Sequence, residues 1–201
     1  MGELLSFAEL GVRHILDANG LDHVVFLVAL AAIYRFRDVR EVLWVVSAFT
    51  VGHSITLALA VMGALALPAA LVEFLIPVTI VSTAVENVVV SDRARAAWKG
   101  RHRPVLAGVF GLVHGAGFAA YLESLFVDRL AVPLLGFNLG IEVGQLVVLI
   151  GPGLALALFD RAISVSRATS ARWPALRLRT VSVSLVVIAF ASQWALERGP
   201  W

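Results

Sequence analysis

The chain has 201 residues, of which 60% are hydrophobic and only 15% are charged, and its mean hydropathy is +0.90. A soluble domain carries about 25% charged residues, so this composition argues against a water-soluble enzyme or a nucleic-acid-binding module, and the net charge of +2 does not change that. The absence of Cys excludes disulfides, thiolate metal ligands and Cys-based catalysis. We therefore predict an integral membrane protein.

Taken in chain order, six runs of mostly apolar residues approach or reach the roughly 20 residues with which a helix crosses the hydrocarbon core. They lie at 21–34, which is short, and at 42–66, 69–90, 104–126, 132–159 and 178–196. This pattern predicts an all-α fold, a polytopic transmembrane helical bundle. Its six spans occupy 21–196, within a single integral membrane domain over 1–201.

The segment before the first run, 1–20, contains Glu3 and Glu9 and lacks the basic start of a signal peptide. We expect it to form a short helix on the outer face, from about Leu4 to Leu16, that ends before the turn-forming pair Asn19-Gly20. A re-entrant element is the alternative for this segment.

Basic residues are distributed asymmetrically among the loops. Of the 16 Lys and Arg residues, 13 fall in or beside three alternate loops, at 35–41, 91–103 and 160–177. The positive-inside rule then places these loops in the cytoplasm and both chain termini outside it. Nucleic-acid binding is the other interpretation of such clusters, but contact with anionic lipid headgroups explains them better here.

Polar side chains recur along one helical face in three of the runs. They are Ser47, Thr50, His53 and Ser54 in the second run, Thr79, Ser82, Thr83 and Glu86 in the third, and Asn138, Glu142 and Gln145 in the fifth. Hydroxyl groups often bond their own helix backbone, and amides or a single histidine often join helices. Buried carboxylates need a partner, a proton or a cation. The aligned stripes therefore predict a functional cavity.

Chain counting also predicts the depth of these groups. At about 1.5 Å of helical rise per residue, three side chains from three runs reach the midplane: His53, His114 and Glu142. The outer mouth would hold Asp22 and His23, with His14 just before them, and Glu86 would lie toward the cytoplasmic end. Imidazole and carboxylate ligands suit Ni, Co, Zn or Fe.

Five segments carry a resemblance to a known family. They are HILDANGLDHVVFL (14–27), FTVGHSITL (49–57), VEFLIPVTIVSTAVEN (72–87), GLVHGAGFA (111–119) and GFNLGIEVGQL (136–146). Together they resemble the HupE/UreJ family of bacterial membrane proteins, nearer its second, broader branch. The resemblance implies a multi-pass protein of the bacterial inner membrane, associated with nickel or cobalt uptake. This sequence differs from the nickel-transporting members of the family in two places. The gap between His14 and the pair Asp22-His23 is longer, and the second motif is altered to His114-Gly115 followed by Glu123.

These observations predict a permease rather than an enzyme, whose substrate is a divalent transition metal, nickel or cobalt before zinc. Asp22 and His23 would capture the ion. The midplane residues would hold it, with Asn138 and Gln145 supporting them, and Glu86 would pass it inward or carry a compensating proton. The predicted metal-site residues are His14, Asp22, His23, His53, Glu86, His114, Asn138, Glu142 and Gln145.

Two alternatives remain open at this point. An intramembrane metal-dependent hydrolase would use zinc bound by His53, His114 and a third ligand, with Glu142 or Glu86 activating water. No GxSxG, HExxH or GxxxxGK[ST] motif is present in the sequence, so nothing local supports catalysis or nucleotide-driven transport. An accessory membrane subunit without a site is the second alternative.

Overall fold

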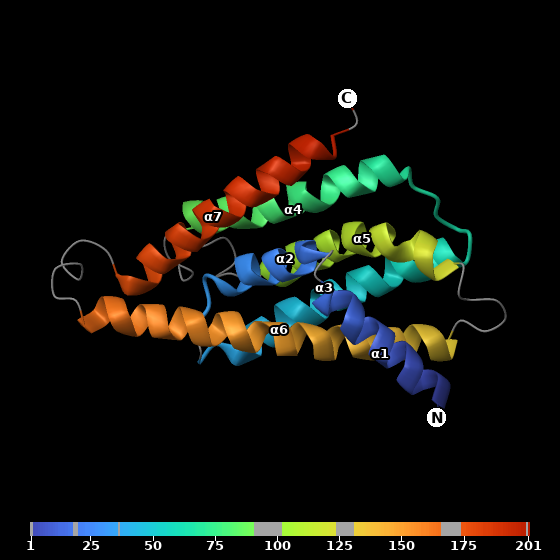
Figure 1. Ribbon diagram of the computed structural model, residues 1–201, viewed down its shortest axis with the longest axis horizontal. Helices are drawn as coiled ribbons and strands as arrows, with labels where there is room; N and C mark the ends of the chain where they lie inside the picture. Colours follow the sequence, from blue (N-terminus) through green and yellow to red (C-terminus); the bar gives the residue numbers. More distant parts are fainter. Residues whose placement is uncertain are drawn as a thin grey trace.

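The computed structural model describes residues 2–17, 20–35, 37–90, 102–123, 131–165, 174–199 and 201. Within these ranges the chain is all helical, without strands. The helices are α1 (Gly2–Leu16), α2 (Leu21–Ala31), α3 (Val39–Val61), α4 (Ala69–Val89), α5 (His102–Glu123), α6 (Ala131–Val165) and α7 (Ala175–Glu197) (Figure 1). The predicted all-α class is confirmed.

Four of the described helices, α3, α4, α6 and α7, are each long and apolar enough to cross a membrane. A fifth candidate is the pair α1 and α2, which together meet the requirement but are bent by 73° at the break between them. The prediction of six spans is therefore confirmed only in part. The first predicted run is the 11-residue α2, which is too short to cross alone, and α5 is not established as a span.

Helix α1 packs along the first half of α6 instead of standing apart from the bundle. A Cβ atom added at Gly136 or Gly140 would collide with the backbone oxygens of Leu4 and Ala8, and one at Gly11 with that of Phe137. Small residues let helix backbones approach in this way. A helix does form in this segment, as expected, but the expectation that it lies apart on the outer face is wrong, because it packs on α6. Together α1 and α2 make a discontinuous unit that enters the bundle.

Close backbone contacts at glycine residues also join α3 to α5. A Cβ atom at Gly52 would meet the backbone of Gly108, and Cβ atoms at Gly111 and Gly115 would meet the backbones of Phe49 and His53. Since the contacting residue numbers rise together along the two helices, α3 and α5 run parallel. This close approach positions two of the histidines described below.

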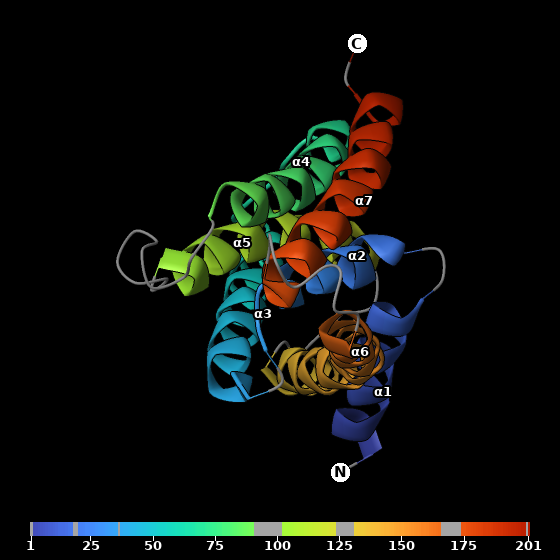
Figure 2. The same ribbon diagram turned by 90° about the vertical axis from the view of Figure 1, so that its left-hand side faces the viewer.

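Four arginines gather at one end of the bundle, which we call the basic end: Arg103 and Arg179, which are buried, Arg177, which is half-buried, and Arg35, which is exposed. The ends of α2, α4 and α6 and the starts of α3, α5 and α7 all lie here, at the left in Figure 1. Arg177, for example, donates from α7 to the carbonyl oxygens of Asn87 and Val90 at the end of α4, each at 3.2 Å. Figure 2 shows α4 and α7 side by side above the other helices.

Both chain termini lie away from the basic end. Leu4 packs against Gly136 near the start of α6, and the Trp201 ring lies 5.7 Å from that of Phe74 near the start of α4. Among the described residues, the four arginines of the basic end and the two chain termini therefore lie at different ends of the bundle, while the predicted basic residues at 91–101 and 166–173 lie outside the described ranges.

Candidate metal centre

Four histidine side chains from four helices meet inside the bundle. We call them the histidine cluster: His14 of α1, His23 of α2, His53 of α3 and His114 of α5. Ring centroids lie 4.7 Å apart for His14 and His23, 6.1 Å for His53 and either of these, and 5.3 Å for His23 and His114. Residues scattered over a hundred positions of the chain thus come to one point.

The break between α1 and α2 brings the first two rings together. On a continuous helix, residues nine positions apart would be separated by about 13 Å along the axis. The 73° bend instead places His14 and His23 in ring contact. The bend between α1 and α2, a place that the sequence analysis treated as the end of a surface helix, therefore brings these two rings of the centre together.

Three of the imidazoles are buried, that of His14 is half-buried, and their ring nitrogens largely lack hydrogen-bond partners in the described part of the chain. Exposure is 8% for His23, 0% for His53 and 1% for His114. Among the described residues, Nε2 of His14, Nε2 of His23 and both ring nitrogens of His53 have no hydrogen-bond partner. Since most buried polar atoms in proteins are hydrogen-bonded, so many unpartnered nitrogens at one point indicate a binding site. One ligand atom from each of these three residues lies within 4.8 Å of the other two.

A threonine fixes the tautomer of the fourth imidazole. Thr79 Oγ1 donates its proton to the carbonyl oxygen of Ile76 at 2.7 Å, and it also lies 3.0 Å from Nε2 of His114. A hydroxyl has one proton to donate, so Nε2 of His114 must be the donor in the second contact. The lone pair then resides on Nδ1, which is buried without a partner among the described residues.

Aromatic rings enclose the cluster. Phe118 lies 3.9 Å from the ring of His14 and stacks on Phe137 at 5.2 Å, and Phe49 lies 5.1 Å from His114. Such an apolar wall limits water and strengthens electrostatic interactions at the imidazoles.

Asp22 is adjacent to His23 and forms an ion pair that sequence analysis missed. Its Oδ2 accepts a hydrogen bond from Arg198 at 2.9 Å, while its Oδ1 is buried without a partner among the described residues. Arg198 follows α7 and also lies 5.6 Å over the Trp194 ring. The prediction of a separate outer mouth at Asp22 and His23 is wrong for His23, which is part of the cluster, and Asp22 lies at its edge. An arginine so close to the chain end offered no pattern that could have revealed this pair.

The carboxylate expected at the midplane lies outside the cluster. Glu142 accepts a hydrogen bond from Ser47 at 2.7 Å, and Gln145 accepts one from Thr50 at 2.9 Å. These contacts join α3 to α6 as interhelical hydrogen bonds. The predicted meeting of Glu142 with His53 and His114 therefore does not occur. Asn138 is half-buried on α6, and its Oδ1 has no partner in the described part of the chain.

Glu86 lies at the basic end and is paired there. Nε2 of His102 lies 2.5 Å from Oε1, and Arg103 lies 3.2 Å from Oε2 and donates to Asn87 at 2.6 Å. Sequence analysis assigned His102 and Arg103 to a loop, whereas α5 begins at His102. The only signal in the sequence was that these two residues directly precede an apolar run that starts at Pro104.

Fold and site together define a polytopic helical membrane protein with a buried imidazole cluster. The family model described as HupE / UreJ protein matches residues 1–198, essentially the whole chain. The chain belongs to the HupE/UreJ family, which is generally related to nickel and cobalt transport. No curated protein and no solved structure matches the chain.

Proposed function

We propose that the protein is a secondary permease that moves a divalent transition metal, nickel or cobalt before zinc, through the histidine cluster. The observation that carries this proposal is the convergence of four imidazoles, three of them buried and that of His14 half-buried, whose nitrogens largely lack hydrogen-bond partners among the described residues. Neutral imidazole is a ligand for nickel, cobalt and zinc, and thiolate ligands, which would select softer ions, are absent from the sequence.

The dimensions of the cluster suit an ion that is bound and then released. Metal–nitrogen bonds are about 2.0–2.1 Å long, so two nitrogens on one ion lie at most about 4.2 Å apart. The ligand atoms of His14, His23 and His53 lie within 4.8 Å of one another, so small ring rotations would close the site. A transporter must release the ion that it binds. A site that closes by rotation of side chains alone can open again in the same way, so binding there would be reversible.

The broken helix supports a transport role. In many secondary transporters the binding site lies near the bilayer midplane, at discontinuous helices. If α1 and α2 together make one broken span and α5 makes a further, continuous span, these two and the four helices α3, α4, α6 and α7 would cross the membrane six times. The basic end would then face the cytoplasm of a bacterial cell, both termini would lie outside the inner membrane, and the ion would move inward past Asp22 and leave near Glu86.

The hydrolase alternative lacks support from the carboxylates that it would need. Glu142 accepts from Ser47, and Glu86 is paired with His102 and Arg103. Neither touches the histidine cluster, so neither is positioned to activate a metal-bound water there.

Metal accumulation in cells that express the protein tests the proposal, with Ni, Co, Zn and Fe compared. We expect nickel or cobalt to accumulate, and His53→Leu to abolish that accumulation. Thr56→Val is the matched control, because Thr56 is a buried polar residue one turn further along α3 and lies outside the cluster. Equal accumulation with His53→Leu, at equal protein levels, would contradict the permease and favour an accessory subunit.

A further inference from the structure

The carboxylate of Glu142 has no counter-ion among the described residues. It accepts a hydrogen bond from Ser47 at 2.7 Å, and none of the ion pairs that the described residues form includes it. Glu142 lies about 16 Å along α6 from the first residue of that helix, well inside the span. A carboxylate in such a place requires a cation or a proton, and the described part of the chain supplies no cation.

The charged groups of the neighbouring helices are distant or already paired. The arginines of α3, α5 and α7 lie in the first two turns of these helices, at the basic end. On α1, Arg13 is paired with Glu9 at 2.6 Å. On α6 the next charged residue after Glu142 is Asp160, about 27 Å further along the helix axis. The charge of Glu142 is therefore not balanced from any of these helices.

Two amide side chains flank Glu142 on the same face of α6. Asn138 lies four residues before it and Gln145 three residues after it. Oδ1 of Asn138 and Nε2 of Gln145 are buried without a partner among the described residues, and Gln145 as a whole is 0% exposed. Because most buried polar atoms in proteins are hydrogen-bonded, these two amides beside an unpaired carboxylate indicate a binding site.

Thr50 allows Gln145 to turn its oxygen toward a cation. Oγ1 of Thr50 lies 2.9 Å from Oε1 of Gln145 and 3.2 Å from the carbonyl oxygen of Val46, but a hydroxyl has one proton for these two acceptors. Half a turn of the amide would resolve the competition, because Nε2 would donate to Thr50 and Thr50 to Val46. Oε1 would then take the buried position of Nε2, where no described group contacts it.

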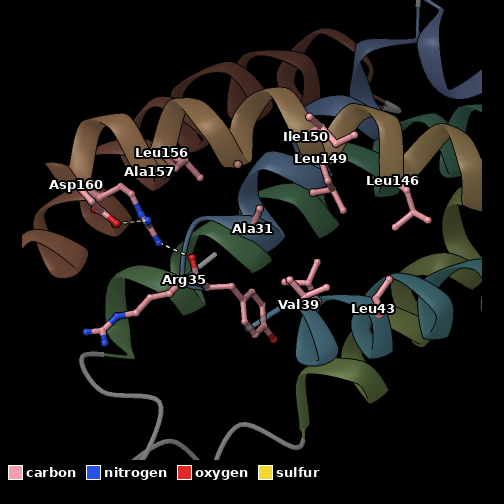
Figure 3. Close-up of a pocket in the computed structure, with 14 residues that line it drawn as sticks. Ala31, Arg35, Val39, Leu43, Leu146, Leu149, Ile150, Leu156, Ala157 and Asp160 are labelled. Atoms are coloured by element: carbon pink, nitrogen blue, oxygen red, sulfur yellow. Dashed lines mark hydrogen bonds and ion pairs between the residues drawn. The ribbon is translucent and has the colours of Figure 1, made fainter. Parts of the chain in front are cut away.

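Apolar side chains surround these polar groups. Toward the basic end α6 continues with Leu146 and Leu149, which line a groove together with Leu43 of α3 (Figure 3). On the core side of α6, Phe137 and Ile141 are fully buried. Apolar surroundings make an unbalanced carboxylate costly and strengthen its attraction for a cation.

We propose that Glu142, Asn138, Gln145 and Ser47 bind an alkali cation between α3 and α6. All four side chains offer oxygen atoms, which hard cations prefer, and none offers the imidazole that suits nickel or cobalt. One carboxylate balances one positive charge. A monovalent ion therefore leaves the site neutral, whereas a divalent ion would leave a net charge inside the membrane.

This site adjoins the histidine cluster without sharing a residue with it. Thr50 lies three residues before His53 on α3, so the two sites border the same turn of that helix. Its role in transport rests on the proposed permease: Na⁺ that enters down its own gradient would then drive the uptake of the metal. Binding of the alkali cation itself requires no transition metal.

Equilibrium binding of radioactive Na⁺ to the purified protein in detergent, with a chelator to remove transition metals, tests the proposal. We expect one Na⁺ per chain in the wild type and none in Glu142→Gln, which keeps an oxygen atom to accept from Ser47. Glu73→Gln is the matched control, because Glu73 is an exposed carboxylate on α4, and it should bind Na⁺ as the wild type does. His53→Leu should also retain Na⁺, so failure of the permease and failure of the cation site give different results.

A second variant tests the amide ligands. Asn138→Leu should weaken Na⁺ binding about tenfold, because the cation loses one oxygen ligand, and thermal unfolding without Na⁺ shows whether each variant is folded. Equal Na⁺ binding by the wild type and Glu142→Gln would overturn the site. A wild type that binds no Na⁺ would overturn it too, and the occupant of the Glu142 carboxylate would then be a proton.

Discussion

The two polar regions of the bundle, the histidine cluster and the basic end, are built on opposite principles. At the basic end each buried arginine contacts an anion or a carbonyl oxygen, although Nε and Nη1 of Arg103 have no partner among the described residues. Arg179 contacts Asp160 and the carbonyl oxygen of Tyr34 at 2.5 and 2.6 Å, and Arg103 contacts Glu86 at 3.2 Å. In the histidine cluster, both nitrogens of His53 are buried with no partner among the described residues.

This difference separates groups that stabilise the fold from groups that carry function. A buried polar atom without a partner costs about 1–3 kcal/mol, so the cluster weakens the empty protein. The ion pair of Arg179 and Asp160 at the basic end instead joins α7 to α6, and hydrogen bonds from Arg179 to the carbonyl oxygens of Ala32 and Tyr34 attach the segment that follows α2. Replacing a polar side chain by an apolar one should therefore have opposite effects on stability in the two regions.

The largest effect is expected for Arg179→Met at the basic end. The Arg179 side chain is 2% exposed and binds Asp160 together with the carbonyl oxygens of Ala32 and Tyr34. Its removal leaves a partly buried carboxylate without a counter-ion, so we expect a loss of about 3 kcal/mol in the free energy of unfolding. Thermal unfolding in detergent, followed by tryptophan fluorescence, measures this change.

The double variant Arg179→Met with Asp160→Asn is the control for that experiment. It removes the uncompensated charge and should recover part of the lost stability. A single variant as stable as the wild type would mean that the ion pair does not hold the helices.

The next largest effect is expected for Gly140→Ala, which acts on the cluster from a distance. The added methyl group would collide with the backbone of Ala8 and push α1, with His14, away from α6. Overpacking of this kind costs about 1–3 kcal/mol, and metal binding should weaken although Gly140 is no ligand. Gly151→Ala, where a Cβ meets nothing within 4 Å, is the control. Isothermal titration with Ni²⁺ compares the two, and equal affinities would contradict the packing role.

Much of the fold could be predicted from the sequence because apolar length and charge asymmetry are local properties. The runs that became α3, α4, α6 and α7 were found in this way, and the described arginines of the basic end belong to the loops that the charge asymmetry selected. The packing of α1 on α6 was not predicted, since it depends on glycines at 136 and 140 meeting a segment more than a hundred residues earlier.

For the site, sequence reasoning found the residue types but not their grouping. All four histidines were candidates, yet depth counting assumed that each run is a straight and complete span. That assumption fails at His23, whose run is the short α2 next to a 73° bend, and it was not applied to His14, which precedes the first run. The partners of Glu142 and Asp22 depend on helix rotation and on a distant chain end. Contacts of this kind are tertiary and leave no local pattern.

In the histidine cluster, His53→Leu should stabilise the metal-free protein while abolishing metal binding. Leucine is of similar size and brings no unpartnered nitrogen, so the free energy of unfolding should rise by about 1 kcal/mol. Thermal unfolding with and without Ni²⁺ measures both effects: the metal should raise the melting temperature of the wild type alone. A destabilised His53→Leu protein would show that the imidazole is structural and would remove the contrast between the regions.

The smallest effect is expected where the two principles meet, at the Asp22–Arg198 pair. Here a carboxylate beside the cluster is bound to an arginine at 2.9 Å, with side-chain exposures of 15% and 31%. An incoming cation would compete with Arg198 for that carboxylate. Arg198→Gln should therefore tighten Ni²⁺ binding, by about fivefold or less, since a partly exposed pair contributes at most about 1 kcal/mol.

The conservative variant decides what the Asp22–Arg198 pair does. Arg198→Lys keeps the positive charge and should bind Ni²⁺ as the wild type does, and Asp22→Asn should cancel the gain of Arg198→Gln, because no carboxylate is then left to release. If Arg198→Gln instead weakens binding as much as Asp22→Asn does, the arginine orients the carboxylate for the ion. The pair would then belong with the ion pairs of the basic end, which hold structure, rather than with the unpartnered histidines.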